Sequence, residues 1–373
     1  MVVESRQALV RLEQLALWCV DRWFRCPKQA ALQGQGILFG QGRLRCWSEN
    51  TGVVVSCMHL LLALDQGFEP LAAVALTSYL LHQRFTSVVL VTPADQRMHQ
   101  LEAIAAAFEC PCRHQPIAPE AALHRLPSEV QPYFFCIEAL QQSEPGRYLY
   151  VDADTLCVAG LEPLAELPLH ASNPLAASSH GRPMHDRSLL LGLEGPYHYF
   201  NAGILLFDSV LLNAVLRPDQ VVDYFLQHQA LCRFREQCAL NALLSGQVQF
   251  LPSQYNLLSW MRSRQSSAPW HNLACNPMAY CLPDVREKMA IAHLSAGALP
   301  DRLPPDRLER PDRYWLMLQQ ALEQQQEMSE RGQAAASPTN MGTGMDAEME
   351  RRASEHLRQQ QQAHHHHHGQ GLP

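Results

Sequence analysis

The sequence has no concentration of lysine and arginine. Its 29 basic residues are outnumbered by 36 acidic ones, which leaves a formal net charge of −7. Binding to nucleic-acid phosphates needs a clustered basic surface, because the phosphates must be neutralised by nearby cations. The composition therefore argues against DNA or RNA as a partner.

Long apolar runs and paired cysteine motifs are also missing. The longest apolar stretch, residues 53–64, is interrupted by Ser56 and His59 and is shorter than the ~20 residues of a membrane-spanning helix. No apolar segment with a cleavage site marks the N-terminus, so no secretory signal is expected. Of the 12 cysteines, only Cys110 and Cys112 lie close together, and no second pair completes a zinc site. These absences predict a cytoplasmic protein with reduced thiols.

From residue 58 onward the chain alternates strand-like and helix-like segments. Strand candidates lie at 58–65, 87–92, 147–151, 201–208, 248–251 and 289–292, and helix candidates at 71–83, 96–108, 218–229, 236–244 and 311–331. This alternation predicts an α/β fold with a mainly parallel sheet flanked by helices. Ligands of such sheets bind at the carboxyl ends of strands, which directs attention to Asp65 and Asp152.

Composition divides the chain into three parts. Residues 1–57 are rich in Gln, Arg and Trp and are predicted to be an appendage to the globular domain of residues 58–331. Residues 332–373 contain glutamine runs and five consecutive histidines at 364–368. Their low apolar content predicts a disordered tail, and we favour a solvated histidine run over a metal-chelating one.

Two aspartates follow the strand candidate at residues 147–151, in the motif Asp152-Ala153-Asp154. Side chains at i and i+2 of an extended chain point to one face, so both carboxylates can reach one cation. Hard oxygen ligands suit magnesium or manganese, which can also bridge a diphosphate. An aspartate pair at a strand end is equally typical of a turn, so the motif alone leaves both interpretations open.

Three further segments carry polar residues suited to a sugar or metal site. Asn201 offers a donor and an acceptor to a sugar hydroxyl, and Gly203 permits close backbone approach. Gln237 and Asn241 are four residues apart and share one face of a helix. His293 ends the last strand candidate, where an imidazole can complete a metal's coordination. Without the aspartates, a core histidine would be the simpler interpretation.

In order and spacing, these motifs resemble glycosyltransferase family 8, a family of retaining sugar transferases with the GT-A fold. The resemblance extends over about residues 58–318. The matched positions are Asp65 and Phe68 at the end of the opening strand, Asp152 and Asp154 in Asp-x-Asp, Asn201 and Gly203 in Phe-Asn-x-Gly, Glu236 and Gln237 in Asp-Gln-Asp, residues 251–256 in the Leu-Pro…Asn loop, and His293. The resemblance implies a GT-A type nucleotide-diphospho-sugar transferase fold.

The resemblance also implies an activity and a cofactor. The expected enzyme is a metal-dependent hexosyltransferase that moves a sugar from a UDP-sugar to an acceptor hydroxyl with retention of configuration. A manganese or magnesium ion is assigned to Asp152, Asp154 and His293. Such an ion acts as a Lewis acid on the departing diphosphate.

Roles in substrate binding follow from the same resemblance. Gln237 is placed beneath the anomeric carbon, where its carbonyl oxygen is expected to stabilise developing positive charge. Asn201 and Glu236 are the other catalytic candidates, and Asn201 is expected to contact the donor sugar. Asp65 and Phe68 are expected to hold the uracil base, with the phenylalanine in place of a stacking tyrosine.

Departures from the family pattern remove positive charge near the diphosphate. Leu299 replaces a phosphate-binding lysine, and Phe135 or a neighbour replaces an arginine. One such electrostatic donor typically contributes ~3 kcal/mol, and Arg302 or Arg182 is a candidate to compensate. The losses keep open a second function, a catalytically silent sugar-nucleotide or carbohydrate-binding protein. A sugar-1-phosphate nucleotidylyltransferase is disfavoured because residues 64–69 lack its glycine-rich basic loop.

Overall fold

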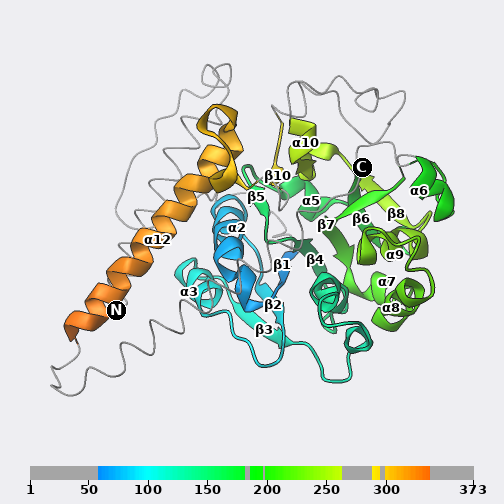
Figure 1. Ribbon diagram of the computed structural model, residues 1–373, viewed down its shortest axis with the longest axis horizontal. Coiled ribbons are helices and arrows are strands. Elements are labelled where there is room, and N and C mark those ends of the chain that lie inside the picture. Colours follow the sequence, from blue (N-terminus) through cyan, green and yellow to red (C-terminus); the bar gives the residue numbers. More distant parts are fainter. Residues whose placement is uncertain (1–57, 181–184, 196–197, 263–287, 295–298, 337–373) are drawn as a thin grey trace, which may run out of the picture. The chain divides into compact units, whose positions relative to one another are not determined.

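A seven-stranded mixed sheet organises the computed structural model (Figure 1). The structure describes residues 58–180, 185–195, 198–262, 288–294 and 299–336. The strands lie in the order β3-β2-β1-β4-β7-β6-β8. Their bounds are β1 Met58–Ala63, β2 Val88–Thr92, β3 Cys112–Pro116, β4 Arg147–Val151, β6 Leu175–Ser179, β7 Phe200–Asp208 and β8 Val248–Leu251.

Strand direction reverses at β7. β1 pairs in parallel with β2 and β4, and β2 pairs in parallel with β3. β7 is antiparallel to both of its neighbours, β4 and β6, whereas β6 and β8 are parallel to each other. The carboxyl ends of β1 and β4 therefore meet the start of β7 at one edge of the sheet, which brings together the segments around Asp65, Asp152 and Asn201.

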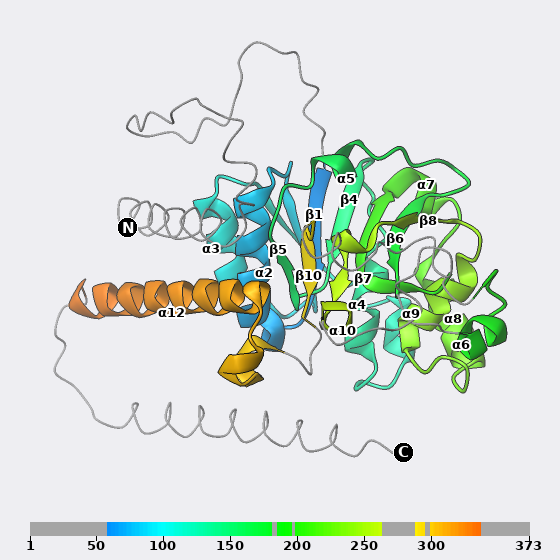
Figure 2. The same cartoon turned by 90° about the horizontal axis from the view of Figure 1, so that it is seen from above.

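Helices cover both faces of this sheet (Figures 1 and 2). Their bounds are α2 Glu69–His82, α3 His99–Ala107, α4 Phe135–Ala139, α5 Glu162–Glu166, α6 His185–Leu190, α7 Ser209–Asn213, α8 Pro218–Gln227, α9 Arg235–Leu243, α10 Ser259–Arg262 and α12 Arg310–Ala336. On β1, Leu60 and Leu62 pack in one cluster with α2, α3 and the first turns of α12. Leu61 packs in the other cluster with α4, α8 and α9. β2 is buried at every position, as a strand covered on both faces should be.

A small second sheet brings distant segments to the end of β4. It contains β5 (Thr155–Cys157), β10 (Ile291–His293) and β9 (Leu257–Leu258), in the order β5-β10-β9. β10 is antiparallel to β5 and pairs His293 with Thr155. The Leu294 N–H also donates to the carbonyl oxygen of Asp154 at 2.8 Å. These backbone contacts hold His293 beside the Asp-x-Asp motif.

The predicted α/β fold with a mainly parallel sheet flanked by helices is confirmed. The strand candidates at 147–151 and 248–251 agree with β4 and β8 at both ends. Four strands, β3, β5, β6 and β9, were not predicted. β3 is polar, β6 is built of small residues after its leucine, and β5 and β9 have only three and two residues. Such segments lack a period-two apolar pattern, so only pairing with neighbours makes them strands.

The predicted division into parts is only partly covered by the structure. Residues 1–57 and 337–373 lie outside the described residues, and α12 continues to Ala336, beyond the predicted helix end at 331. The pattern of contacts between residues divides the chain into two compact units, Met1–Glu323 and Gln324–Pro373. Across the described ranges, no helix combines the length and the apolar character that crossing a membrane requires.

Candidate active site

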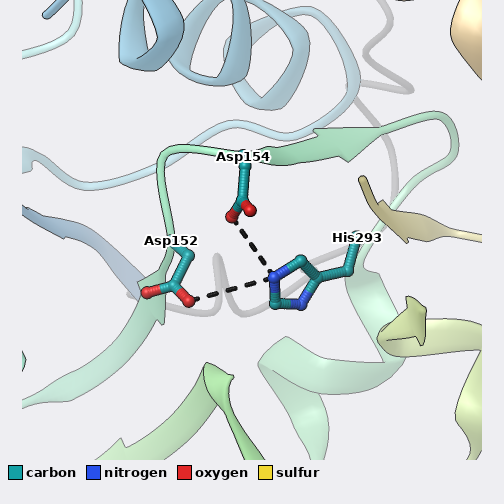
Figure 3. A group of neighbouring side chains, drawn as sticks. All are labelled: Asp152, Asp154 and His293. Atoms are coloured by element: carbon teal, nitrogen blue, oxygen red, sulfur yellow. Dashed lines mark ion pairs between the residues drawn. The ribbon is translucent and has the colours of Figure 1, made fainter. Parts of the chain in front are cut away.

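Asp152, Asp154 and His293 converge at the carboxyl end of β4. One ligand atom from each lies within 4.8 Å of those from the other two. The Nε2 atom of His293 is 3.2 Å from Asp154 Oδ1 and 3.9 Å from Asp152 Oδ2. Figure 3 shows the imidazole directed toward both carboxylates. Three residues predicted to act together are therefore neighbours in space.

The local geometry differs from the expected strand end. β4 stops at Val151, and residues 152–154 form a turn that leads into β5. The Thr155 hydroxyl donates to the carbonyl oxygen of Asp152 at 2.7 Å and closes this turn. The two carboxylates therefore do not share a face through regular strand alternation. The turn places them around His293, so the motif is both a turn and a potential ligand pair.

Two further contacts fix Asp152. Its backbone N–H donates to the Gly203 carbonyl oxygen at 2.8 Å, which ties the motif to β7. The buried Tyr150 hydroxyl donates to Asp152 Oδ1 at 2.7 Å, which leaves Oδ2 toward His293. Tyr150 was not among the predicted site residues. Its spacing of two from Asp152, on the same strand face, was the available signal.

The pKa values of Asp152 and Asp154 shift in opposite directions. Burial, together with repulsion from Asp154, raises the pKa of Asp152 to about 6. Burial also acts to raise the pKa of Asp154, but the ion pair and hydrogen bond with His293 outweigh it and hold that pKa below its usual value. Adjacent carboxylates of this kind are stabilised by a nearby cation.

The donor atoms fit a divalent metal ion. Two carboxylate oxygens and one imidazole nitrogen are a donor set that suits manganese or magnesium. The space around them depends on Gly203, since a Cβ there would lie 2.3 Å from His293 Cε1 and 2.6 Å from Asp152 Oδ2. Gly203 therefore allows β7 to approach Asp152 and His293 closely.

Amide side chains line the neighbouring part of the site. Asn201 Nδ2 and the backbone N–H of Ala202 both donate to Gln237 Oε1, at 3.1 and 3.0 Å. Gln237 Nε2 donates to the Tyr199 hydroxyl at 3.1 Å. The Gln237 carbonyl oxygen thus already accepts two hydrogen bonds from the protein. Its expected role at the anomeric carbon stays a prediction, and it requires the oxygen to be released from, or shared with, these donors.

Glu236, at the start of α9, is a half-buried acid with one carboxyl oxygen that is fully buried. Within the described part of the chain its Oε2 atom is buried and has no hydrogen-bond partner. Burial raises its pKa to about 8, with backbone hydrogen bonds opposing the shift and Asp152 adding to it. A carboxyl group in this state can donate a hydrogen bond to a ligand hydroxyl near neutral pH.

The predicted base-binding residues follow β1. Asp65 accepts a hydrogen bond from the Gly67 N–H at 2.9 Å and caps the 3-10 turn Gln66–Phe68. Phe68 is 50% exposed, so its ring is open to a planar ligand rather than part of the core. Because β1 and β4 are parallel neighbours, these residues lie at the same sheet edge as Asp152.

The two positions at which the family pattern has a phosphate-binding cation hold apolar side chains that pack against or within the core. Leu299 packs against the core, and Phe135 is buried at the start of α4. Arg302 lies in the 3-10 turn Pro300–Arg302 and is exposed, whereas Arg182 lies outside the described residues. Compensation by either arginine stays a prediction.

Comparison with known proteins identifies the family. The sequence model described as Glycosyl transferase family 8 matches residues 59–277, which is more than half of the chain. The chain belongs to this family. It is therefore a glycosyltransferase, as the motifs predicted. The matched segment contains the Asp-x-Asp motif and Gln237 but ends before His293, which only the fold brings to the aspartates.

The curated relative that we compare has low sequence identity to this chain. The lipopolysaccharide 1,2-glucosyltransferase of Escherichia coli K12 is 26% identical over 119 residues, which cover 31% of this chain and 35% of that protein. The chain thus spans about a third of the length of this curated relative.

Solved structures share the GT-A fold. The galactosyltransferase LgtC, in complex with donor and acceptor sugar analogues, superposes with a TM-score of 0.54 at 20% identity and covers 70% of this chain and 95% of its own. The glycosyltransferase GlyE of Streptococcus pneumoniae TIGR4 gives a TM-score of 0.52 at 18% identity and covers 73% of this chain and 64% of its own.

Proposed function

We propose that this glycosyltransferase uses a divalent metal ion to move a hexose from a UDP-sugar to an acceptor hydroxyl, with retention of anomeric configuration. The observation that carries the proposal is the convergence of Asp152, Asp154 and His293 at the end of β4. Two carboxylates and an imidazole from segments far apart in sequence form a donor set suited to manganese or magnesium.

The metal side of the site neutralises charge. Asp152, Asp154 and His293 would hold the ion, which when bound supplies Lewis-acid stabilisation of the departing diphosphate. Tyr150 orients Asp152 through its hydrogen bond. Because Leu299 brings no charge, the carboxylate–imidazole set carries more of the electrostatic work here than in relatives with a lysine.

The sugar side lies along β7 and α9. Asn201 and the protonated Glu236 would bind donor-sugar hydroxyls, and Gly203 would allow the β7 backbone to approach the donor closely. Gln237 is our candidate for stabilising the positive charge that develops on the sugar, as in other glycosyl transfers. A glutamine is a poor nucleophile, so we favour same-face attack in which the leaving phosphate oxygen takes the acceptor's proton.

The base side is formed by Asp65 and Phe68. The exposed Phe68 ring offers a stacking surface for uracil, and Asp65 offers a carboxylate acceptor at the same strand end. Both residues lie where ligands of parallel sheets bind, at the carboxyl ends of the strands.

Release of UDP from UDP-glucose and UDP-galactose, measured with and without Mn²⁺, tests the proposal. We expect turnover that stops on chelation and falls roughly 10²-fold or more in Asp154→Asn, because an electrostatic stabiliser is lost. The matched control is Asp223→Asn, whose exposed ion pair with Arg125 lies away from the site and whose loss should leave turnover unchanged. A rate of UDP release that is unchanged both by chelation and by Asp154→Asn would overturn the proposal.

A further inference from the structure

A chain of hydrogen bonds connects the sugar side of the site to the metal side. The Gly203 N–H donates to Asn201 Oδ1 at 3.0 Å, and Asn256 Nδ2 donates to the same oxygen at 2.8 Å. Asn256 Oδ1 lies 2.9 Å from His293 Nδ1. Asn256 is fully buried and His293 is 5% exposed, so there is little room for water to replace these partners.

The backbone of β7 determines how the first amide is oriented. A backbone N–H can only donate, so the Asn201 atom facing Gly203 must be the oxygen. The Asn201 amino group then points to Gln237 Oε1, which also receives the Ala202 N–H. Two consecutive N–H groups of one strand therefore set both amides without ambiguity.

This orientation passes through Asn256 to the imidazole. Because Asn201 presents an oxygen, Asn256 must turn its amino group toward it. Its carbonyl oxygen then faces His293 Nδ1, which must carry a hydrogen to complete the bond. With the Nδ1 proton held by Asn256, it is the Nε2 proton, shared with Asp154 in the ion pair, that a metal would displace, so the neutral ring would face the metal through Nε2.

We propose that Asn256 is a positioning residue that fixes the Nδ1–H tautomer and the ring orientation of His293, and that the β7 backbone dictates this choice through Asn201. The inference rests on the metal site proposed above. Partners of this kind typically change metal affinity by about 10–100-fold when they are removed, although they do not touch the ion. β7, which carries Asn201 on the sugar side, thereby also determines the orientation of His293 on the metal side.

Mn²⁺ affinity, measured by titration with detection of free Mn²⁺ by electron paramagnetic resonance, tests the inference without any substrate. Asn256→Leu keeps the approximate size but removes the acceptor, so we expect binding to weaken about 10–100-fold. Asn256→Asp loses the donor to Asn201 but keeps an acceptor for the His293 Nδ1–H, so its loss of affinity should stay below about tenfold. Thermal unfolding of each variant shows that the folded protein is being titrated.

The outcomes separate this inference from the proposed function. Equal losses in folded Asn256→Leu and Asn256→Asp would show that the acceptor for the His293 Nδ1–H does not set the Mn²⁺ affinity, and unchanged binding in both would also overturn the inference. Asp154→Asn is titrated alongside them. If it binds Mn²⁺ as the native chain does, the metal site itself is wrong. If it loses binding while Asn256→Leu does not, only the role of Asn256 is wrong.

Discussion

Single residues at this site are constrained by distances that leave no room for larger side chains. Gly203 lies on β7 between Asp152 and His293, and its backbone accepts a hydrogen bond from the Asp152 N–H. Its φ is not in the left-handed region, so the need for glycine comes from space alone. The position links strand geometry directly to the proposed metal site.

Gly203→Ala should weaken Mn²⁺ binding and lower turnover. The new Cβ would meet His293 Cε1 at 2.3 Å, so either the ring or β7 must move. Overpacking of this kind also costs about 1–3 kcal/mol in the free energy of unfolding. Mn²⁺ titration and chemical denaturation measure the two effects. Gly146→Ala, whose nearest contacts would be His59 at 3.3 Å and Tyr148 at 3.4 Å, is the control and should keep native Mn²⁺ affinity. Native affinity in Gly203→Ala would contradict the close approach.

At the scale of elements, α9 and β7 act as one unit. Asn241 on α9 accepts the Phe200 N–H at 2.8 Å and donates to the Phe200 carbonyl oxygen at 2.9 Å. It also donates to the Gln237 carbonyl oxygen at 2.8 Å. The shared helix face predicted for Gln237 and Asn241 therefore anchors the first residue of the strand that carries Asn201.

Asn241→Leu should destabilise the protein and disturb the sugar side. The side chain is 1% exposed, and its removal leaves the Phe200 N–H and carbonyl oxygen buried without these partners. Each unpaired group costs about 1–3 kcal/mol, so we expect a loss of ~2–4 kcal/mol in the free energy of unfolding. Urea denaturation measures this loss. Asn213→Leu, which removes a single hydrogen bond from an exposed residue, should cost less than about 1 kcal/mol. Equal effects of the two changes would count against the anchoring role.

Across the whole molecule, the active site carries a stability cost that depends on pH. Burial raises the pKa of Glu236 from 4.5 to about 8. The unfolded chain releases this proton near pH 4.5, whereas the folded chain keeps it up to about pH 8. The unfolded state therefore binds fewer protons between these values, and the stability of the fold declines as pH rises through this window.

Glu236→Gln should remove that part of the decline. From pH 5 to pH 8, the free energy of unfolding of the native chain should fall by on the order of a few kcal/mol more than that of the variant, because glutamine does not titrate. Thermal unfolding at both pH values measures the difference. The exposed Glu166→Gln is the control and should follow the native pH dependence. Parallel curves for native and Glu236→Gln would show that Glu236 ionises freely in the folded state.

The sequence by itself determined the fold class and the family and singled out the three side chains that converge at the end of β4, because these depend on local signals. Short apolar runs, β-branched in the case of β2, predicted β1, β2 and β4, and the spacing of Asp152 and Asp154 predicted a ligand pair at a strand end. Such patterns arise within a few residues of chain, so periodicity and turn chemistry suffice to detect them.

Only the tertiary structure decided how these parts work together. The turn at residues 152–154, the antiparallel placement of β7 and the pairing of β10 with β5 bring His293 to the aspartates. The amide chain through Asn256 and the two donors on the Gln237 carbonyl oxygen depend on the same long-range packing. Local periodicity does not show which distant groups meet, because these contacts form only when the chain folds. The direction of the hydrogen bonds is also decided in the folded chain, here by the N–H groups of the β7 backbone, which can only donate.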